Sequence, residues 1–186
     1  MKPVALALIL AAAVPFSAQA IEYQRVQADQ SAITFSYQQM GVAMDGKFGA
    51  FTAQLNFDPA NPAAAKAAIG VDLASIDTGS TEGDEEVAGK LWFNTPAFPT
   101  ARFVTHTVKA LGGDRYEVIG PLTIKGKTQD VVIPVTFIPQ GNTGVFDGGF
   151  TLRSADFAIG EGPWAAFDVV ANEIHIQFRI IAHSGE

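Results

Sequence analysis

Hydrophobic and polar residues alternate along several stretches of this chain, and this period of two is the dominant pattern in its sequence. The clearest stretch runs over residues 173–182, where every second side chain is apolar and the intervening ones are polar as far as Arg179. Successive side chains of a β-strand point to opposite faces, so this pattern predicts a strand with one buried face and one solvated face. Strands of this kind are typical of antiparallel sheets.

The same alternation predicts three further strands, over residues 32–37, 51–57 and 116–124. Less regular patterns predict four more, over residues 68–74, 102–109, 131–138 and 145–153. Phe48 is out of phase with Phe51, so we expect a bulge or bend near Gly49. A bent strand is what a sheet needs in order to close into a barrel.

Two short helices are expected between the strands. The first would have Asn61 as its cap and Pro62 at its first position, followed by an alanine-rich stretch. The second would begin at Thr81, because acidic residues from Glu82 onward favour the positive end of a helix dipole. Eight or nine strands with turn signals between them, and no internal repeat, predict a single all-β barrel or sandwich domain.

The first twenty residues are typical of a secretory signal peptide. Lys2 supplies a positive charge, Val4–Val14 is an apolar run of about eleven residues, and Ala18–Ala20 has small residues at a cleavage site. A membrane-spanning helix would need roughly twenty apolar residues. We therefore expect cleavage before Ile21, which would leave residues 21–186 as a domain exported to the periplasm.

Composition narrows the range of partners. The net charge is −7, and loss of Lys2 with the signal peptide would make it one unit more negative, which argues against nucleic acid and against attraction to anionic lipid. The chain has no cysteine, so disulfides, a lipid-modified N-terminal cysteine and covalently attached c-type haem are excluded. Hydrophobic residues make up 48% of the chain, and they must lie in a core or around a ligand.

One motif could carry chemistry. Asp77–Ser80 matches the Asp-Thr-Gly-Ser signature of aspartic proteases, whose mechanism needs two carboxylates that share a proton. A single motif per chain would require a homodimer. The alternative is a turn after a strand, in which Asp77 accepts hydrogen bonds from nearby backbone N–H groups. The three histidines show no metal-binding spacing, and we predict no catalytic residue, no metal site and no cofactor.

Seven short stretches, taken in order, resemble the YceI-like family of polyisoprenoid-binding proteins over essentially the whole chain after residue 20. These stretches are Ser31–Phe35, Gly46–Phe48, Phe57–Pro59, Ala74–Gly79, Phe98–Phe103, Gly120–Gly126 and Phe157–Gly160. The chain departs from the family after the Thr-Gly turn, where many members carry Arg-Asp-x-His-Leu. Of that motif, Gly83–Val87 retains only Asp84.

The resemblance implies an eight-stranded, antiparallel, lipocalin-like barrel with one or two short helices. It implies a carrier rather than an enzyme, whose pocket holds a long isoprenoid lipid such as the tail of ubiquinone or of a polyprenyl phosphate. Many members are periplasmic, and some are encoded beside or fused to a membrane cytochrome of the diheme b type, which would be a partner. Two alternatives remain open: an aspartic-protease-like hydrolase that uses Asp77, and a ligand-free barrel that binds another protein.

The strand phases predict which side chains would contact a lipid. The expected pocket wall consists of Phe35, Phe51, Leu55, Phe57, Phe103, Leu122, Ile176 and Phe178. The segment from Glu82 to Phe93 is expected to form an acidic lid, with Asp84, Trp92 and Phe93 at the mouth. The missing Arg and His predict recognition of the tail rather than of a charged headgroup.

Overall fold

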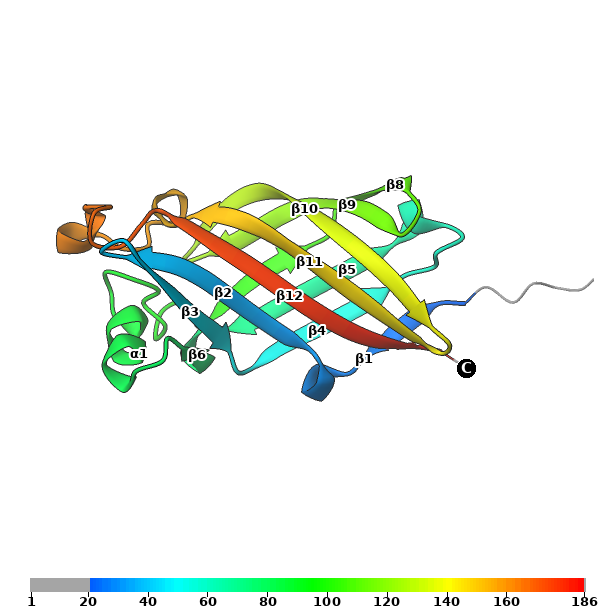
Figure 1. Cartoon of the computed structure of the whole chain (residues 1–186), viewed down its shortest axis with the longest axis horizontal. Coiled ribbons are helices and arrows are strands. Elements are labelled where there is room, and N and C mark those ends of the chain that lie inside the picture. The colour runs from blue at the N-terminus through cyan, green and yellow to red at the C-terminus, as the bar shows by residue number, and fades with distance from the viewer. Residues whose placement is uncertain (1–20, 186) are drawn as a thin grey trace, which may run out of the picture.

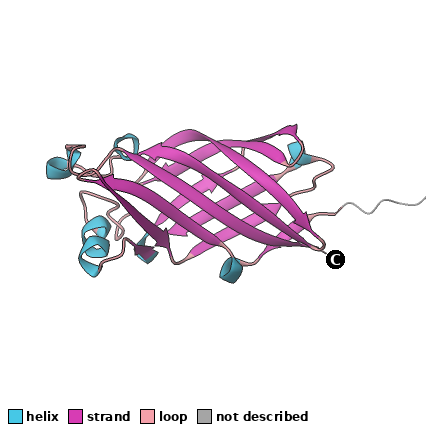
Figure 2. Cartoon of the chain, viewed as in Figure 1, coloured by secondary structure: helices cyan, strands magenta, loops and turns pink. Residues whose placement is uncertain are grey.

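The computed structural model describes residues 21–185, so the predicted signal peptide lies outside the described residues. Twelve strands form one antiparallel sheet that curls into a barrel, with α1 at one end (Figure 1, Figure 2). The strands are β1 (Tyr23–Val26), β2 (Ala32–Gln39), β3 (Val42–Phe48), β4 (Phe51–Asn56), β5 (Lys66–Asp72), β6 (Ile76–Asp77), β7 (Thr100–Val104), β8 (Thr107–Gly112), β9 (Arg115–Ile124), β10 (Lys127–Gln140), β11 (Thr143–Arg153) and β12 (Glu173–Ser184).

A bent strand closes the sheet. From β4 the order of neighbours is β5, β7, β9, β10, β11, β12, β2 and β3, and the chain runs from β3 directly into β4 through Gly49 and Ala50. Ser75 fixes both N–H groups at the bend. The N–H of Gly49 donates to the carbonyl oxygen of Ser75 at 2.8 Å, and the N–H of Ala50 donates to the hydroxyl of Ser75 at 2.9 Å. The bend predicted near Gly49 is therefore confirmed, and it joins the two ends of the sheet.

The twelve strands reduce to the eight of the expected barrel. β3 and β4 form one bent strand, β7 and β8 pair in succession with β9, and β1 and β6 are short additions. The antiparallel barrel fold predicted from the sequence is confirmed.

The single strand predicted over residues 102–109 is wrong, because β7 ends at Val104 and β8 begins at Thr107. Phe103 pairs with Leu122 and Thr107 pairs with Ile119, so three residues of one strand face two of the other, Gly120 and Pro121. Proline has no N–H to donate to the ladder, and an extra residue on one strand is a bulge. The break between β7 and β8 is therefore explained by Gly120 and Pro121 of the partner strand β9.

The helices are short and lie outside the barrel. α1 spans Thr81–Ala88, as predicted from Thr81, and the hydroxyl of Ser80 caps it by accepting a hydrogen bond from the N–H of Gly83 at 3.1 Å. The expected helix after Asn61 is only a 3-10 turn, Pro62–Ala64, because β5 begins two residues later and leaves no room for more. The other 3-10 turns are Ala28–Gln30, Leu73–Ser75, Ser154–Phe157 and Gly162–Ala165. Within residues 21–185, no helix has the length and apolar character needed to cross a membrane.

Candidate functional site: an apolar cavity inside the barrel

The barrel encloses a cavity of about 750 Å³, a volume typical of small-molecule sites. Its wall is built mostly from apolar side chains on the inner faces of the strands. Along β12 the lining extends from Ile174 to Ile180, which at about 3.3 Å per residue corresponds to a depth of roughly 20 Å. The cavity is therefore long and narrow, and it follows the strands.

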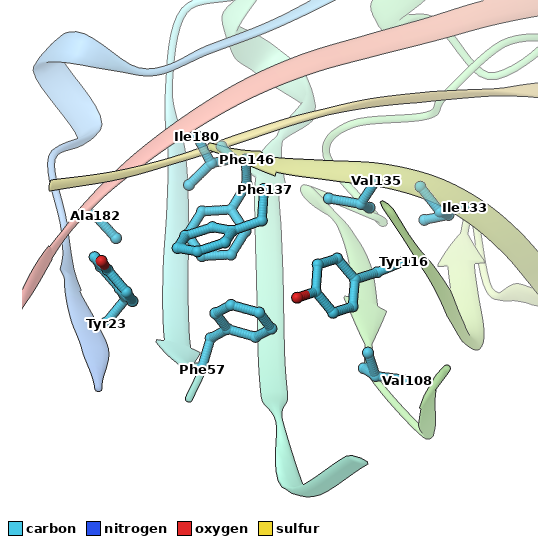
Figure 3. Packing of buried hydrophobic residues seen from close by; sticks show 10 residues of the cluster. All are labelled: Tyr23, Phe57, Val108, Tyr116, Ile133, Val135, Phe137, Phe146, Ile180 and Ala182. Carbon is cyan, nitrogen blue, oxygen red and sulfur yellow. The ribbon is translucent and has the colours of Figure 1, made fainter. Parts of the chain in front are cut away.

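An aromatic cluster packs the barrel at the end that carries the β10–β11 turn (Figure 3). Phe57 packs against Phe137 and Phe146, with ring centroids 4.8 Å and 5.2 Å away, and Tyr23 lies 5.0 Å from Phe137. Gly144 makes this packing possible, because a Cβ there would lie 2.6 Å from the ring of Phe137 and 2.8 Å from that of Tyr23. These rings fill the barrel interior, so the cavity is closed at this end.

Seven of the eight predicted wall residues line the cavity. They are Phe35, Leu55, Phe57, Phe103, Leu122, Ile176 and Phe178. Phe51, the eighth, follows the bend and is partly buried against the aromatic cluster, outside the lining. The strand phases read from the sequence therefore place these side chains correctly on the inner face, and their contact with a ligand stays a prediction.

The cavity opens between β3 and α1. Asp45 on β3 and Glu82 and Glu86 on α1 are exposed, yet they also line the cavity, which is what residues at an opening do. Glu82 and Glu86 are four residues apart and share one face of the helix. That spacing is the sequence signal that could have identified them as mouth residues. The opening is thus acidic on both sides.

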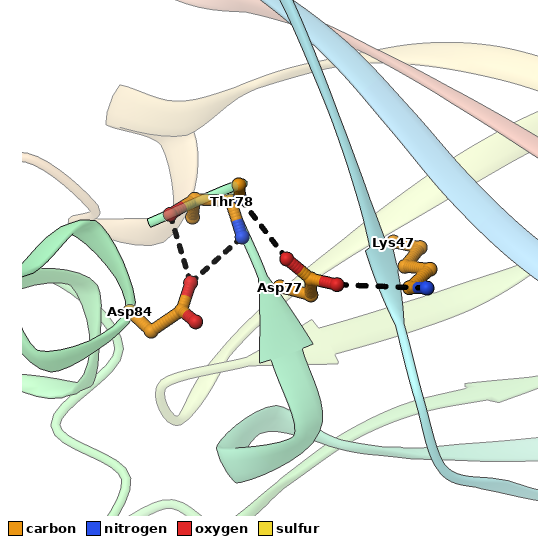
Figure 4. Close-up of polar contacts among 5 residues, drawn as sticks. Lys47, Asp77, Thr78 and Asp84 are labelled. Atoms are coloured by element: carbon orange, nitrogen blue, oxygen red, sulfur yellow. Dashed lines mark hydrogen bonds and ion pairs between the residues drawn. The ribbon is translucent and has the colours of Figure 1, made fainter. Parts of the chain in front are cut away.

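The three predicted lid residues have different positions. Trp92 and Phe93 line the cavity, and the ring of Trp92 packs against that of Trp164 at 5.5 Å. Asp84 is not part of the lining: its Oδ1 accepts hydrogen bonds from the N–H and the hydroxyl of Thr78, at 2.7 Å and 2.8 Å (Figure 4). Asp84 therefore fixes α1 to the turn that precedes it.

Asp77 has the environment of a structural turn residue. Its carboxylate accepts a hydrogen bond from the N–H of Gly79 at 3.0 Å, the Asx arrangement expected from the sequence, and its other oxygen lies 3.5 Å from Nζ of Lys47 (Figure 4). An aspartic protease needs a second carboxylate that shares a proton with the first. Here the partners of Asp77 are the N–H group of Gly79 and the ammonium group of Lys47, and neither is a second carboxylate.

We expect Asp77→Asn to leave lipid binding unchanged and to lower the free energy of unfolding by less than about 1 kcal/mol. The amide oxygen of Asn can still accept from Gly79, and the ion pair with Lys47 is solvent-exposed and therefore weak. Urea denaturation and a lipid-binding titration would measure the two effects. Pepstatin-sensitive proteolysis by the wild type, abolished in this variant, would contradict the turn role.

Two tyrosines that line the cavity remain protonated over a wide pH range. Burial raises the pKa of Tyr37 above 10.0, and the nearby carboxylate of Asp84 raises it further. Burial also raises the pKa of Tyr116, and the carboxylate of Asp114 raises it further. Both phenols are therefore neutral near pH 7 and carry no charge into the apolar interior. Within the described part of the chain, no three His, Asp or Glu side chains are grouped to hold a metal ion.

Comparison with known proteins places the chain in a family. The sequence model of the YceI-like domain matches residues 24–182. A UPF0312 protein of Vibrio cholerae is 30% identical over 95% of this chain and 98% of its own length. Another, from Yersinia pestis, is 36% identical over 77% of this chain and 78% of its own length.

Solved structures share the fold. The crystal structure of Burkholderia cenocepacia BcnA has a TM-score of 0.83 and 39% identity, covering 84% of this chain and 99% of that one. A structure described as a polyisoprenoid binding domain from Saccharophagus degradans has a TM-score of 0.70 at 15% identity, covering 89% of this chain and 99% of that one. The second likeness concerns the fold alone.

Proposed function

This chain belongs to the YceI-like family, and on that premise we propose that it is a non-enzymatic carrier of a long isoprenoid lipid. The observation that supports the proposal best is the apolar cavity of about 750 Å³, which is closed by aromatic rings at one end and open at the other. Such a space suits a ligand with one long apolar end. The Saccharophagus degradans domain, which has the same fold, is described as binding polyisoprenoid.

Burial of the tail would supply the affinity. Each CH₂ removed from water contributes about 0.8 kcal/mol, so one five-carbon prenyl unit contributes on the order of 3 to 4 kcal/mol before the cost of ordering it. Several units fit along a lining about 20 Å deep. No charged contact is needed to hold such a ligand.

The mouth favours a neutral headgroup. Asp45, Glu82 and Glu86 lie at the opening, and like charges at the entrance to an apolar pocket repel an anion. Two of the nearby cations are already engaged: Lys125 binds Glu161 at 2.8 Å and Lys47 faces Asp77. A ubiquinone-like lipid meets no such repulsion, so we propose a quinone as the ligand. The proposed compartment is the periplasm, and the proposed partner is a membrane diheme b-type cytochrome.

We expect a ubiquinone-like ligand to bind more tightly than a prenyl pyrophosphate of equal tail length, with a preference that shrinks as salt rises. Salt screens the repulsion between the pyrophosphate and the acidic mouth and leaves the neutral quinone unaffected. Competition between the two ligands at low and high ionic strength measures this. Tighter binding of the pyrophosphate at low salt would contradict it and would indicate a cationic site involving Lys90, Lys125 or Arg153.

Native mass spectrometry of the protein purified from its own periplasm tests the carrier proposal. We expect a co-purified prenyl lipid whose mass identifies the headgroup and the number of units. An empty barrel that also takes up no prenyl quinone in detergent would favour the ligand-free alternative, in which the barrel binds another protein.

A further inference from the structure

The mouth end of the barrel carries large apolar side chains that are exposed to solvent. Their exposed fractions are 70% for Met40, 60% for Val42, 40% for Leu91 and 51% for Phe167. We call these four residues the apolar rim. The other strongly exposed apolar residues of the described chain lie on the barrel wall, at the far end or beside the N-terminus: Ile21, Val104, Leu111, Val132 and Ile138.

Backbone hydrogen bonds hold the apolar rim together. The N–H of Met40, in the β2–β3 turn, donates to the carbonyl oxygen of Val169 at 2.8 Å, two residues after Phe167. The carbonyl oxygen of Leu91 accepts from the N–H groups of Gly160 and Glu161 at 3.0 Å and 2.9 Å. The β2–β3 turn, α1 and the segment around residues 160–170 lie at the same end of the barrel, opposite the β10–β11 turn (Figure 1).

The apolar rim is continuous with the cavity. Trp92 follows Leu91, Trp164 lies three residues before Phe167, and both indole rings line the cavity while packing against each other. On the other side of the opening, Met44 lines the cavity two residues after the exposed Val42. Apolar side chains therefore continue from the outer surface into the barrel, beside the acidic residues Asp45, Glu82 and Glu86 of the opening.

We propose that the apolar rim docks on the surface of a lipid bilayer, so that an isoprenoid passes between the membrane and the cavity without entering water. The inference rests on the proposed carrier function. A prenyl tail is buried both in a bilayer and in the barrel. Between the two it would be exposed to water, and docking of the cavity mouth on the bilayer removes that exposure. Clustered exposed apolar residues mark interaction surfaces, and shallow insertion of such residues is how peripheral proteins bind membranes.

The charges around the rim specify the kind of membrane surface. At this end of the barrel the exposed cations Lys90 and Arg153 are outnumbered by the exposed acidic residues Asp45, Glu82, Glu86 and Asp168. Anionic lipid would repel them, whereas a zwitterionic surface would not. Binding to vesicles that contain anionic lipid should therefore strengthen as salt rises, the opposite of the salt dependence shown by proteins with basic patches. The net charge of −7 acts in the same direction.

The test is transfer of a prenyl quinone from phosphatidylcholine vesicles to the protein, compared with equilibrium binding of the same quinone in detergent. The rim variant combines Met40→Asn, Val42→Thr and Phe167→Ser. The matched control combines Leu111→Ser, Val132→Thr and Ile138→Thr, which remove three exposed apolar side chains away from the mouth. We expect the rim variant to transfer quinone about tenfold more slowly with unchanged binding in detergent, and the control to match the wild type.

The outcomes separate this inference from the carrier proposal. Absence of quinone binding in detergent by the wild type would overturn the carrier proposal itself. Normal binding in detergent with equal transfer rates for the rim variant and the wild type would overturn membrane docking alone. A wild type that is dimeric in size-exclusion chromatography and becomes monomeric in the rim variant would overturn it as well, because the rim would then bind a second copy.

Discussion

Replacement of Gly120 by alanine is expected to lower the free energy of unfolding by about 3 kcal/mol and the thermal midpoint by roughly 6–12 °C. A Cβ at this position of β9 would overlap the carbonyl oxygen of Val104 and would lie 3.1 Å from the amide nitrogen of His106. Both are backbone atoms at the break between β7 and β8, so no side-chain rotation relieves the overlap. The strands must separate, and circular dichroism melting measures the loss.

Gly49→Ala provides the control for this prediction. A Cβ there would lie 3.4 Å from the nearest atom, the carbonyl oxygen of Ser75, which is an ordinary contact. The Gly49 variant should therefore melt within a few degrees of the wild type. Equal midpoints for the two variants would mean that β7 and β8 can move apart without loss of stability.

The break beside Gly120 also illustrates which part of the fold the sequence predicts. Strands such as β9 and β12 were predictable because each has one apolar and one polar face, a pattern contained within the strand itself. The break in β7–β8 arises where Gly120 and Pro121 of the neighbouring strand face it. Residues 102–109 contain no sign of this, because the missing ladder bond belongs to a proline more than ten positions away.

The same distinction applies to the cavity. Wall residues such as Phe35 and Ile176 were identified from phase alone, since the apolar face of a strand in a small barrel is the inner face. Phe51 shares that phase but directly follows the bend, and it is partly buried against the core without lining the cavity, whereas Ala53 and Leu55 further along β4 line it. Asp84 was expected at the mouth, and its bonds to Thr78 depend on how α1 packs on the preceding turn, which no local pattern encodes.

The mouth residues show what helix periodicity can and cannot add. The start of α1 was predicted from Thr81 and the acidic residues that follow it, but the pattern does not say which side of a short polar helix faces a cavity. Glu82 and Glu86 share a face because they are four residues apart, and the structure puts that face beside Asp45 of β3. Their position at the opening depends on the free edge that β3 leaves beyond its short pairing with β6.

A tryptophan inside the barrel should strongly weaken lipid binding. Ala53 on β4 lines the cavity, so Ala53→Trp would place an indole in the space that a tail occupies. Displacement of one prenyl unit removes on the order of 3 to 4 kcal/mol, which corresponds to at least about a hundredfold weaker binding. The unliganded protein should keep its stability, because the ring fills empty apolar volume. Titration with a prenyl quinone in detergent, together with thermal melting, measures both effects.

Gln54→Trp is the matched control, because Gln54 is the next residue of β4 and points to the solvated outer face. The same side chain is introduced into the same strand, and only its direction differs. The control should bind prenyl quinone like the wild type. If both variants lost binding equally, the effect would come from damage to β4. If Ala53→Trp bound normally, the lipid would occupy some place other than the barrel interior, and the cavity would have to be regarded as an empty core.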